Sequence, residues 1–273
     1  MPLWERFEIQ EMLHATIGLN INNLCKSVKS VVKKKELTVE TLKEVILHYA
    51  EGKKYFSMEM LKKVLAAEKY DFAKQTLKQN LNHLTKEKTI FDAGRGWYST
   101  LPETLKLDKS TLEPTVQNIL EQFPLLPFNC WGTQQLNAFF HHMLGKFVIF
   151  IYSEKDYLPT LFDYLRSNGE NVYLNPLKNE VDKNFNIDYQ TLVLRPSITE
   201  ESFVGHYATI EKILVDFYIE SLKLHLTQLS EVRIVFNNIT NQYRINMAAM
   251  LRYSQRRKVK SDIERTLNIP MSL

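Results

Sequence analysis

The order of short patterns between residues 38 and 99 limits the fold more than any other feature of this sequence. Apolar residues recur at helical spacing in three segments, and one short β-prone run lies between the first two. Two further β-prone runs, at residues 89–91 and 97–99, flank a turn that contains Gly94-Arg95-Gly96, whose glycines permit positive φ. Helix, strand, helix, helix and hairpin is the element order of a winged helix-turn-helix. We therefore expect that fold for residues 38–100.

Capping residues mark where the three helices of this region begin. Thr38, Ser57 and Asp71 each precede a segment with apolar residues at helical spacing. Side chains of these types accept hydrogen bonds from the first backbone N–H groups of a helix, which have no partner within the helix. Gly52 follows the first segment and favours its termination, because glycine adopts the left-handed conformation that ends many helices.

The third predicted helix has the polar composition of a DNA-recognition helix. No Asp or Glu occurs between residues 74 and 85, so its outward face carries no carboxylate that DNA phosphates would repel. Gln and Asn can pair with adenine edges, Lys can reach guanine or phosphate, and Arg95 at the turn can reach a minor groove or a phosphate. The DNA-contacting residues predicted from this pattern are Lys74, Gln75, Lys78, Gln79, Asn82 and Arg95. A winged helix that only contacts other proteins remains an alternative.

The distribution of charge also favours a polyanion-binding N-terminal region. The net charge of the chain is +4; residues 1–100 contain 17 Lys/Arg and 12 Asp/Glu, whereas residues 101–273 contain 18 and 19. The net positive charge therefore lies in the first hundred residues, although a solvated lysine-rich surface would produce the same count. The two widely spaced cysteines and the absence of a secretory leader or a long apolar run predict a cytoplasmic protein without a membrane segment.

Composition and periodicity divide the chain into four parts. Residues 1–37 form a helical leader, and residues 101–127 form a proline-rich connector. Residues 128–273 alternate strands and helices before a helical end, which predicts an α/β domain with a helical C-terminal segment. In this domain we expect a helix from Thr133, strands at 146–152, 171–174 and 191–195, a helix at 207–221, and helices from 222 to 269. The fold class predicted for the whole chain is mixed α+β.

The sequence predicts no catalytic residue, no metal site and no cofactor. His141 and His142 are adjacent, so on a helix their side chains point apart and do not readily bind one metal ion. Glu154 and Asp156, which follow a strand, keep a nuclease-type site open as an alternative. Asp216 lies within an apolar run, and we expect it to pair with a buried arginine such as Arg195 or Arg252.

A second basic patch is predicted near the C-terminus. Its members are Arg252, Arg256, Arg257 and Lys260. On one continuous helix, Arg252, Arg256 and Lys260 would share a face because they are spaced by four residues. Such a stripe could contact DNA phosphates or an acidic partner, or it could be a solvated helix face.

Five local motifs occur in one recognisable order: GRGWY at 94–98, CWGTQQLNAFF at 130–140, VYLNP at 172–176, TIEKILVDFY at 209–218 and INMAAMLRYSQRR at 245–257. With these motifs the sequence resembles the AbiEi-type antitoxin family of type IV toxin–antitoxin systems, which act in abortive infection. The resemblance covers roughly residues 38–265 and implies a cytoplasmic prokaryotic protein. It further implies a winged helix for double-stranded operator DNA, autorepression of the operon, and antagonism of a nucleotidyltransferase-like toxin.

Three functions are consistent with the sequence. The resemblance favours a DNA-binding antitoxin and transcriptional autorepressor. The first alternative is a protein-interaction module whose winged helix does not bind DNA, and the second is a nucleic-acid-processing enzyme that uses the α/β domain.

Overall fold

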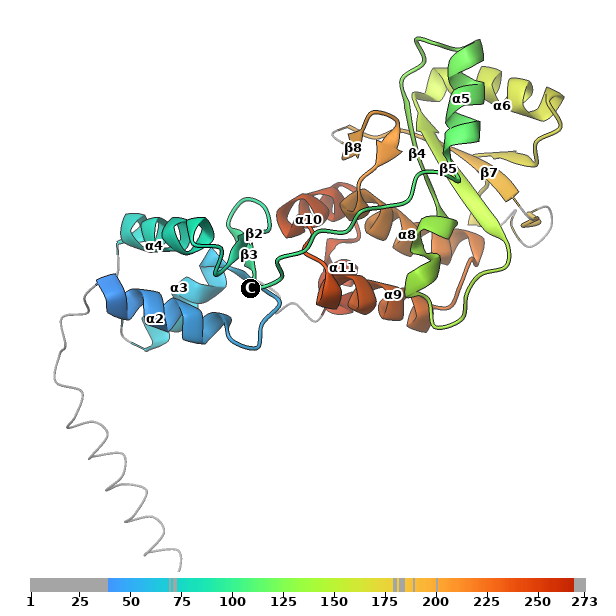
Figure 1. Cartoon of the computed structure of the whole chain (residues 1–273). Helices are drawn as coiled ribbons and strands as arrows, with labels where there is room; N and C mark the ends of the chain where they lie inside the picture. Colours follow the sequence, from blue (N-terminus) through green and yellow to red (C-terminus); the bar gives the residue numbers. More distant parts are fainter. Residues whose placement is uncertain are drawn as a thin grey trace, which may run out of the picture. The chain divides into compact units, whose positions relative to one another are not determined.

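The structure is a computed structural model of the chain, drawn in Figure 1, and it describes residues 39–68, 70, 73–178, 181, 185–188, 190–199 and 201–267. The chain separates into two compact units, residues 1–45 and residues 46–273. Of the first unit, the structure describes residues 39–45, the beginning of helix α2 (Val39–Ala50). The leader predicted at residues 1–37 lies outside the described residues, as does Thr38, the N-cap predicted for the helix that follows it.

Three helices and a small sheet occupy residues 39–99. After α2 come strand β1 (Tyr55–Ser57), helices α3 (Met58–Ala67) and α4 (Lys74–Lys86), and strands β2 (Phe91–Asp92) and β3 (Trp97–Ser99). The strands form an antiparallel sheet in the order β1-β3-β2, with Phe56 opposite Tyr98. Their rings stack with centroids 5.7 Å apart, so the short strand after α2 is joined to the hairpin by aromatic packing.

Local sequence accounts for two helix ends in this region, the start of α3 and the end of α2. The Ser57 side chain accepts a hydrogen bond from the Met60 N–H at 3.1 Å, as its predicted capping role requires. Gly52 follows α2 with φ +72°, which confirms the predicted stop. Helix α4 begins at Lys74 with Ala73 in the capping position, and the predicted cap Asp71 lies outside the described residues.

A six-stranded mixed sheet forms the centre of the remaining chain. Its strands, in the order β6-β7-β5-β4-β9-β8, are β4 (Phe128–Gly132), β5 (Phe147–Ser153), β6 (Val172–Leu174), β7 (Gln190–Pro196), β8 (Phe203–Val204) and β9 (Tyr207–Ala208). β5, β7 and β6 run parallel, β4 is antiparallel to β5 and parallel to β9, and β8 is antiparallel to β9. The predicted strands at 146–152, 171–174 and 191–195 correspond to β5, β6 and β7.

The helix expected from Thr133 is present as a 3-10 helix, η1 (Thr133–Phe139), which directly follows β4. Its capping position is occupied by Gly132 rather than by the predicted cap Thr133. The Thr133 hydroxyl oxygen accepts a hydrogen bond from the Val148 N–H of β5 at 3.0 Å, so it joins the segment to the sheet. The predicted start of this helix is therefore correct, whereas the Thr133 side chain serves the sheet and not the helix N-terminus.

Helices cover both faces of the sheet. Apolar residues of α5 (Glu113–Gln122) and α6 (Leu158–Ser167) pack with Cys130, Ile149 and Ile151 on one face. On the other face, Trp131 and Phe150 pack with the C-terminal helices. These are α8 (Ile210–Leu224), α9 (Leu229–Gln242), α10 (Met247–Arg256) and α11 (Lys260–Thr266). The fold is therefore mixed α+β with a helical C-terminal segment, and the predicted connector contains a helix, α5.

The sequence placed the start of the helix at 207–221 too early. Residues 207–208 form β9, which extends the sheet beside β4, and α8 starts only at Ile210. Among the described residues, no helix is both long and apolar enough to cross a membrane.

The β2–β3 hairpin is attached to the segment that leads into α10. The Tyr55 hydroxyl donates to the Tyr243 carbonyl at 2.5 Å and accepts from the Ile245 N–H at 3.0 Å. The Ala248 N–H donates to the Ala93 carbonyl at 3.4 Å. Strand β1 is thereby hydrogen-bonded to the link between α9 and α10, and the hairpin is hydrogen-bonded to α10 itself.

Gly94 makes the close approach between the hairpin and α10 possible. A Cβ atom added at Gly94 would lie 2.0 Å from the Asn246 side-chain oxygen and 2.8 Å from the Ala248 Cβ, whereas one added at Gly96 would meet nothing within 4 Å. Both glycines have positive φ, +95° and +76°. The two positions therefore share backbone strain but differ in the space available.

We expect Gly94→Ala to destabilise the protein more than Gly96→Ala. Positive φ costs a non-glycine residue about 1–2 kcal/mol at either site, and overpacking adds roughly 1–3 kcal/mol at Gly94 alone. Urea denaturation of both variants measures the difference in free energy of unfolding. Equal losses would show that the hairpin does not depend on its contact with α10.

Candidate functional site

Helix α4 separates its side chains into an apolar and a polar face. Leu77, Leu81 and Leu84 are buried. All six residues predicted to point outward are exposed: Lys74, Gln75, Lys78, Gln79, Asn82 and His83. Their placement agrees with the sequence-based assignment of the outward face, and the role of this face in DNA binding remains a prediction.

The turn of the hairpin presents Arg95 to solvent. The Trp97 N–H donates to the Gly94 carbonyl at 2.8 Å, which closes a tight turn with Arg95 and Gly96 at its centre. The Gly94 N–H donates to the Asp92 carboxylate at 3.3 Å. Arg95 is exposed while Gly94 beside it is buried, so the turn packs against the protein at Gly94 and presents the Arg95 side chain to solvent.

The predicted second basic patch is not a single helical stripe. α10 ends at Arg256 and α11 begins at Lys260, and Lys258 between them has φ +60°. Arg252 and Arg256 lie four residues apart on α10, but the interruption places Lys260 on another helix, so the expectation of a continuous stripe is wrong. Their predicted contact with DNA or an acidic partner is a separate matter and stays a prediction.

Three members of this patch already have partners within the chain. Arg257 contacts the Asp216 carboxylate at 3.0 Å, and Arg256 donates to the Thr199 carbonyl at 2.7 Å. Lys260 lies 3.7 Å from the Glu264 carboxylate. Arg252, by contrast, lies exposed on the surface of α10.

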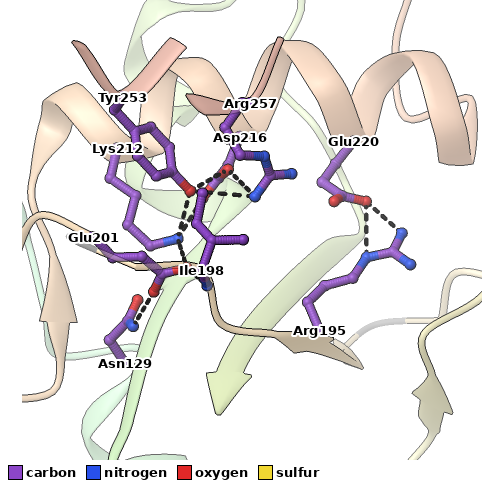
Figure 2. A network of polar contacts seen from close by, with 9 residues as sticks. All are labelled: Asn129, Arg195, Ile198, Glu201, Lys212, Asp216, Glu220, Tyr253 and Arg257. Atoms are coloured by element: carbon purple, nitrogen blue, oxygen red, sulfur yellow. Dashed lines mark hydrogen bonds and ion pairs between the residues drawn. The ribbon is translucent and has the colours of Figure 1, made fainter. Parts of the chain in front are cut away.

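A network of charged side chains is buried between α8, α10 and the sheet (Figure 2). At its centre the Lys212 ammonium donates to the Asp216 carboxylate at 2.5 Å and to the Tyr253 hydroxyl at 3.2 Å. The Tyr253 hydroxyl in turn donates to Asp216 at 2.9 Å. Lys212 and Asp216 are completely buried, and Arg257 contacts the second oxygen of the same carboxylate.

The network extends from Lys212 to the sheet. Glu201 lies 3.6 Å from the Lys212 ammonium and accepts hydrogen bonds from the Ile198 N–H and the Asn129 side-chain amide. The Lys212 ammonium also lies 3.4 Å from the centre of the Tyr152 ring on β5. Strand β4, strand β5 and the segment after β7 are thus linked to one lysine of α8.

A second buried ion pair joins the same helix to β7. Arg195 of β7 contacts one carboxylate oxygen of Glu220 through two of its nitrogens, at 3.1 and 2.5 Å. Its remaining nitrogen donates to the Asn175 side chain and to the Pro176 carbonyl. Lys212, Asp216 and Glu220 are spaced by four residues, so one stripe of α8 carries both pairs against the sheet.

Asp216 pairs with a largely buried arginine, as expected, but that arginine is neither of the two named from the sequence. The structure pairs Asp216 with Lys212 and Arg257 rather than with Arg195 or Arg252. The Lys212–Asp216 pair could be read from its four-residue spacing, whereas the Arg257 contact could not, because it depends on how α10 packs against α8.

Burial and the charge of Asp216 together determine the ionisation of Tyr152, Tyr253 and Arg257. Burial first, and then the Asp216 charge, raise the pKa of Tyr253, and the same two causes raise the pKa of Tyr152 well above its ordinary value. For Arg257, burial alone would lower the pKa, but the Asp216 carboxylate raises it above the usual value. The two tyrosines therefore stay neutral and the arginine stays charged at physiological pH.

The residues considered for catalysis lie apart from this network. Glu154, Asp156, His141 and His142 are exposed. Burial raises the pKa of the Cys130 thiol to about 12, so this cysteine remains protonated. Within the described part of the chain, no group of three or more His, Cys, Asp and Glu residues is arranged to hold a metal ion.

A family model matches residues 76–272, from the first turn of α4 almost to the end of the chain. The model is described as DUF6577, a family of unknown function. The chain belongs to this family. A search of curated proteins finds no match. The matched region contains the hairpin, the six-stranded sheet and the buried charge network, whereas α2 and α3 precede it.

We expect Asp216→Ala to lower the free energy of unfolding by about 3–5 kcal/mol, because two buried cations would lose their shared carboxylate. Asp262→Ala removes a carboxylate whose pairing with Arg265 is much more exposed, and it should cost under about 1 kcal/mol. Urea denaturation of both variants checks the contrast. A loss at Asp216 as small as at Asp262 would exclude the network as a major source of stability.

Proposed function

We propose that residues 39–99 form a winged helix that binds double-stranded DNA, with α4 in the major groove and Arg95 beside it. The observation that carries this proposal is the polar face of α4, on which six basic, amide or imidazole side chains are exposed. Residues 74–86 contain no Asp or Glu. Phosphates could approach this face without meeting a carboxylate of α4.

The spacing on α4 separates two kinds of DNA contact. Gln75, Gln79 and Asn82 are spaced by four and then three residues, so their amides form one stripe along the helix. Lys74 and Lys78, also four residues apart, form a neighbouring stripe. We assign base-edge contacts to the amides and phosphate contacts to the lysines, because amides pair with adenine edges and lysine acts as a point charge.

The hairpin adds a contact at a fixed position. Arg95 lies at the centre of a turn that is closed by a backbone hydrogen bond and flanked by buried Gly94. Less conformational entropy is lost when such a turn binds than when a mobile loop binds. In this proposal Arg95 contacts a phosphate or the minor groove next to the base pairs that α4 reads.

The biological role is proposed from the resemblance to AbiEi-type antitoxins. Under this proposal the DNA is the operator of the chain's own operon, and the protein represses that operon and antagonises a nucleotidyltransferase-like toxin. The duplex to test first is therefore the DNA immediately upstream of its gene. A scaffold that contacts only proteins is the competing role, and it requires no preference for that duplex.

We expect Lys78→Ala and Asn82→Ala to weaken binding in different ways. Loss of a phosphate contact at Lys78 should weaken binding to every duplex and reduce the salt slope by about one unit. Loss of a base contact at Asn82 should cost about 1–3 kcal/mol on the upstream duplex and little on a scrambled one. Arg95→Ala should weaken binding to the upstream duplex as well.

Fluorescence anisotropy with labelled upstream and scrambled duplexes, at several salt concentrations, measures these effects. Lys146→Ala serves as the charge-matched control, because Lys146 is exposed and precedes β5 rather than lying on α4 or the hairpin. Wild-type protein that binds both duplexes equally and weakly would contradict the proposed sequence-specific function.

A further inference from the structure

A long stretch without acidic residues, rich in Lys and Arg, lies in the C-terminal helices. Residues 232–261 contain no Asp or Glu and seven Lys/Arg. The stretch includes most of α9, the whole of α10 and the link to α11. Because this stretch has no carboxylate side chain, a surface built from it would not repel a polyanion, as with the polar face of α4.

Internal contacts distinguish the cations of this stretch. Arg257 faces Asp216, Arg256 donates to Thr199, Lys260 faces Glu264, and the Arg244 guanidinium lies 4.8 Å from the centre of the Phe91 ring. Arg252 and Lys258, by contrast, have exposed side chains, as does Gln255 between them. The outer surface at the C-terminal half of α10 is therefore basic and polar.

The same helix begins at the hairpin. Its capping residue Asn246 lies where a Cβ atom at Gly94 would be, and the Ala248 N–H donates to Ala93. From Asn246 to Arg252 the helix rises by about 9 Å, at roughly 1.5 Å per residue. That distance is less than three base-pair steps of about 3.4 Å each.

The residues between the hairpin and Arg252 leave room for a ligand. Ala248 and Ala249 occupy the first turn of α10, and both are only partly buried. Their small side chains would allow a phosphate backbone that passes the hairpin to approach the helix. A duplex in contact with the hairpin is thus within reach of the exposed surface of α10.

We propose that the DNA-binding surface continues from Arg95 onto α10, where Arg252 and Lys258 contact the phosphate backbone. This inference rests on the proposed DNA-binding function and extends it to a part of the chain outside the winged helix. The contacts are to phosphates, so they contribute to affinity for any duplex and carry no sequence preference.

The test compares Arg252→Gln/Lys258→Gln with Lys146→Gln/Arg166→Gln. Each double variant removes two exposed positive charges, and the control charges lie before β5 and near the end of α6. Glutamine keeps most of the side-chain volume, and the backbone strain at Lys258 applies equally to lysine and glutamine. Binding is measured by anisotropy on the upstream and scrambled duplexes between about 50 and 200 mM salt, the range over which phosphate contacts change affinity most visibly.

We expect the α10 variant to bind both duplexes about ten- to fiftyfold more weakly at 150 mM salt, with a salt slope lower by about two units. The ratio of affinities for the two duplexes should stay unchanged, and the control should bind as the wild type does. If the α10 variant binds with the affinity and salt slope of the wild type, the inference is overturned and the proposed winged-helix function is not affected. Arg252 and Lys258 would then be candidates for contact with an acidic protein partner. Failure of the wild type to bind any duplex would overturn both proposals.

Discussion

Packing of α8 against the sheet depends on burying the Lys212–Asp216 pair with its neighbours. A buried ion pair gains little over apolar residues of the same size, but removing one partner leaves an uncompensated charge in the interior. Asp216 must therefore meet both Lys212 and Arg257, and Lys212 must also face Glu201 and the Tyr152 ring. An apolar helix could slide or rotate on the sheet at small cost. These contacts instead select one position of α8, and through Arg257 one position of α10.

The position of α10 in turn determines where the hairpin lies. Asn246 at its start occupies the space that a side chain at Gly94 would fill, and Ala248 is hydrogen-bonded to Ala93. A conformational restraint thus runs from the buried charges, along one helix, to the turn that presents Arg95. If Arg95 contacts DNA, the entropy of ordering that turn is lost during folding rather than during binding, which favours affinity.

Sequence patterns succeeded where a local rule was sufficient. The cap at Ser57, the stop at Gly52, the exposed face of α4 and the strand at β5 follow from side-chain type and periodicity. The errors involve tertiary contacts. Thr133 has the pattern of a helix cap, but its hydroxyl accepts a hydrogen bond from β5. Arg257 has the pattern of a surface cation, but it forms an ion pair with the buried Asp216. The dependence of Gly94 on Asn246 joins positions 152 residues apart, and no spacing rule indicates such a contact.

The buried network also clarifies what a salt titration of this protein would measure. Its three cationic side chains (Arg195, Lys212 and Arg257) face three anionic ones (Glu201, Asp216 and Glu220), so the network contributes no net charge. The excess of +4 therefore resides in the other charged residues of the chain. Dissolved ions screen exposed charges within about 8–10 Å at physiological ionic strength but hardly affect buried pairs. Added salt should weaken polyanion binding at the surface while leaving the α8–α10 contacts in place, so a change in salt slope would report on surface cations rather than on partial unfolding.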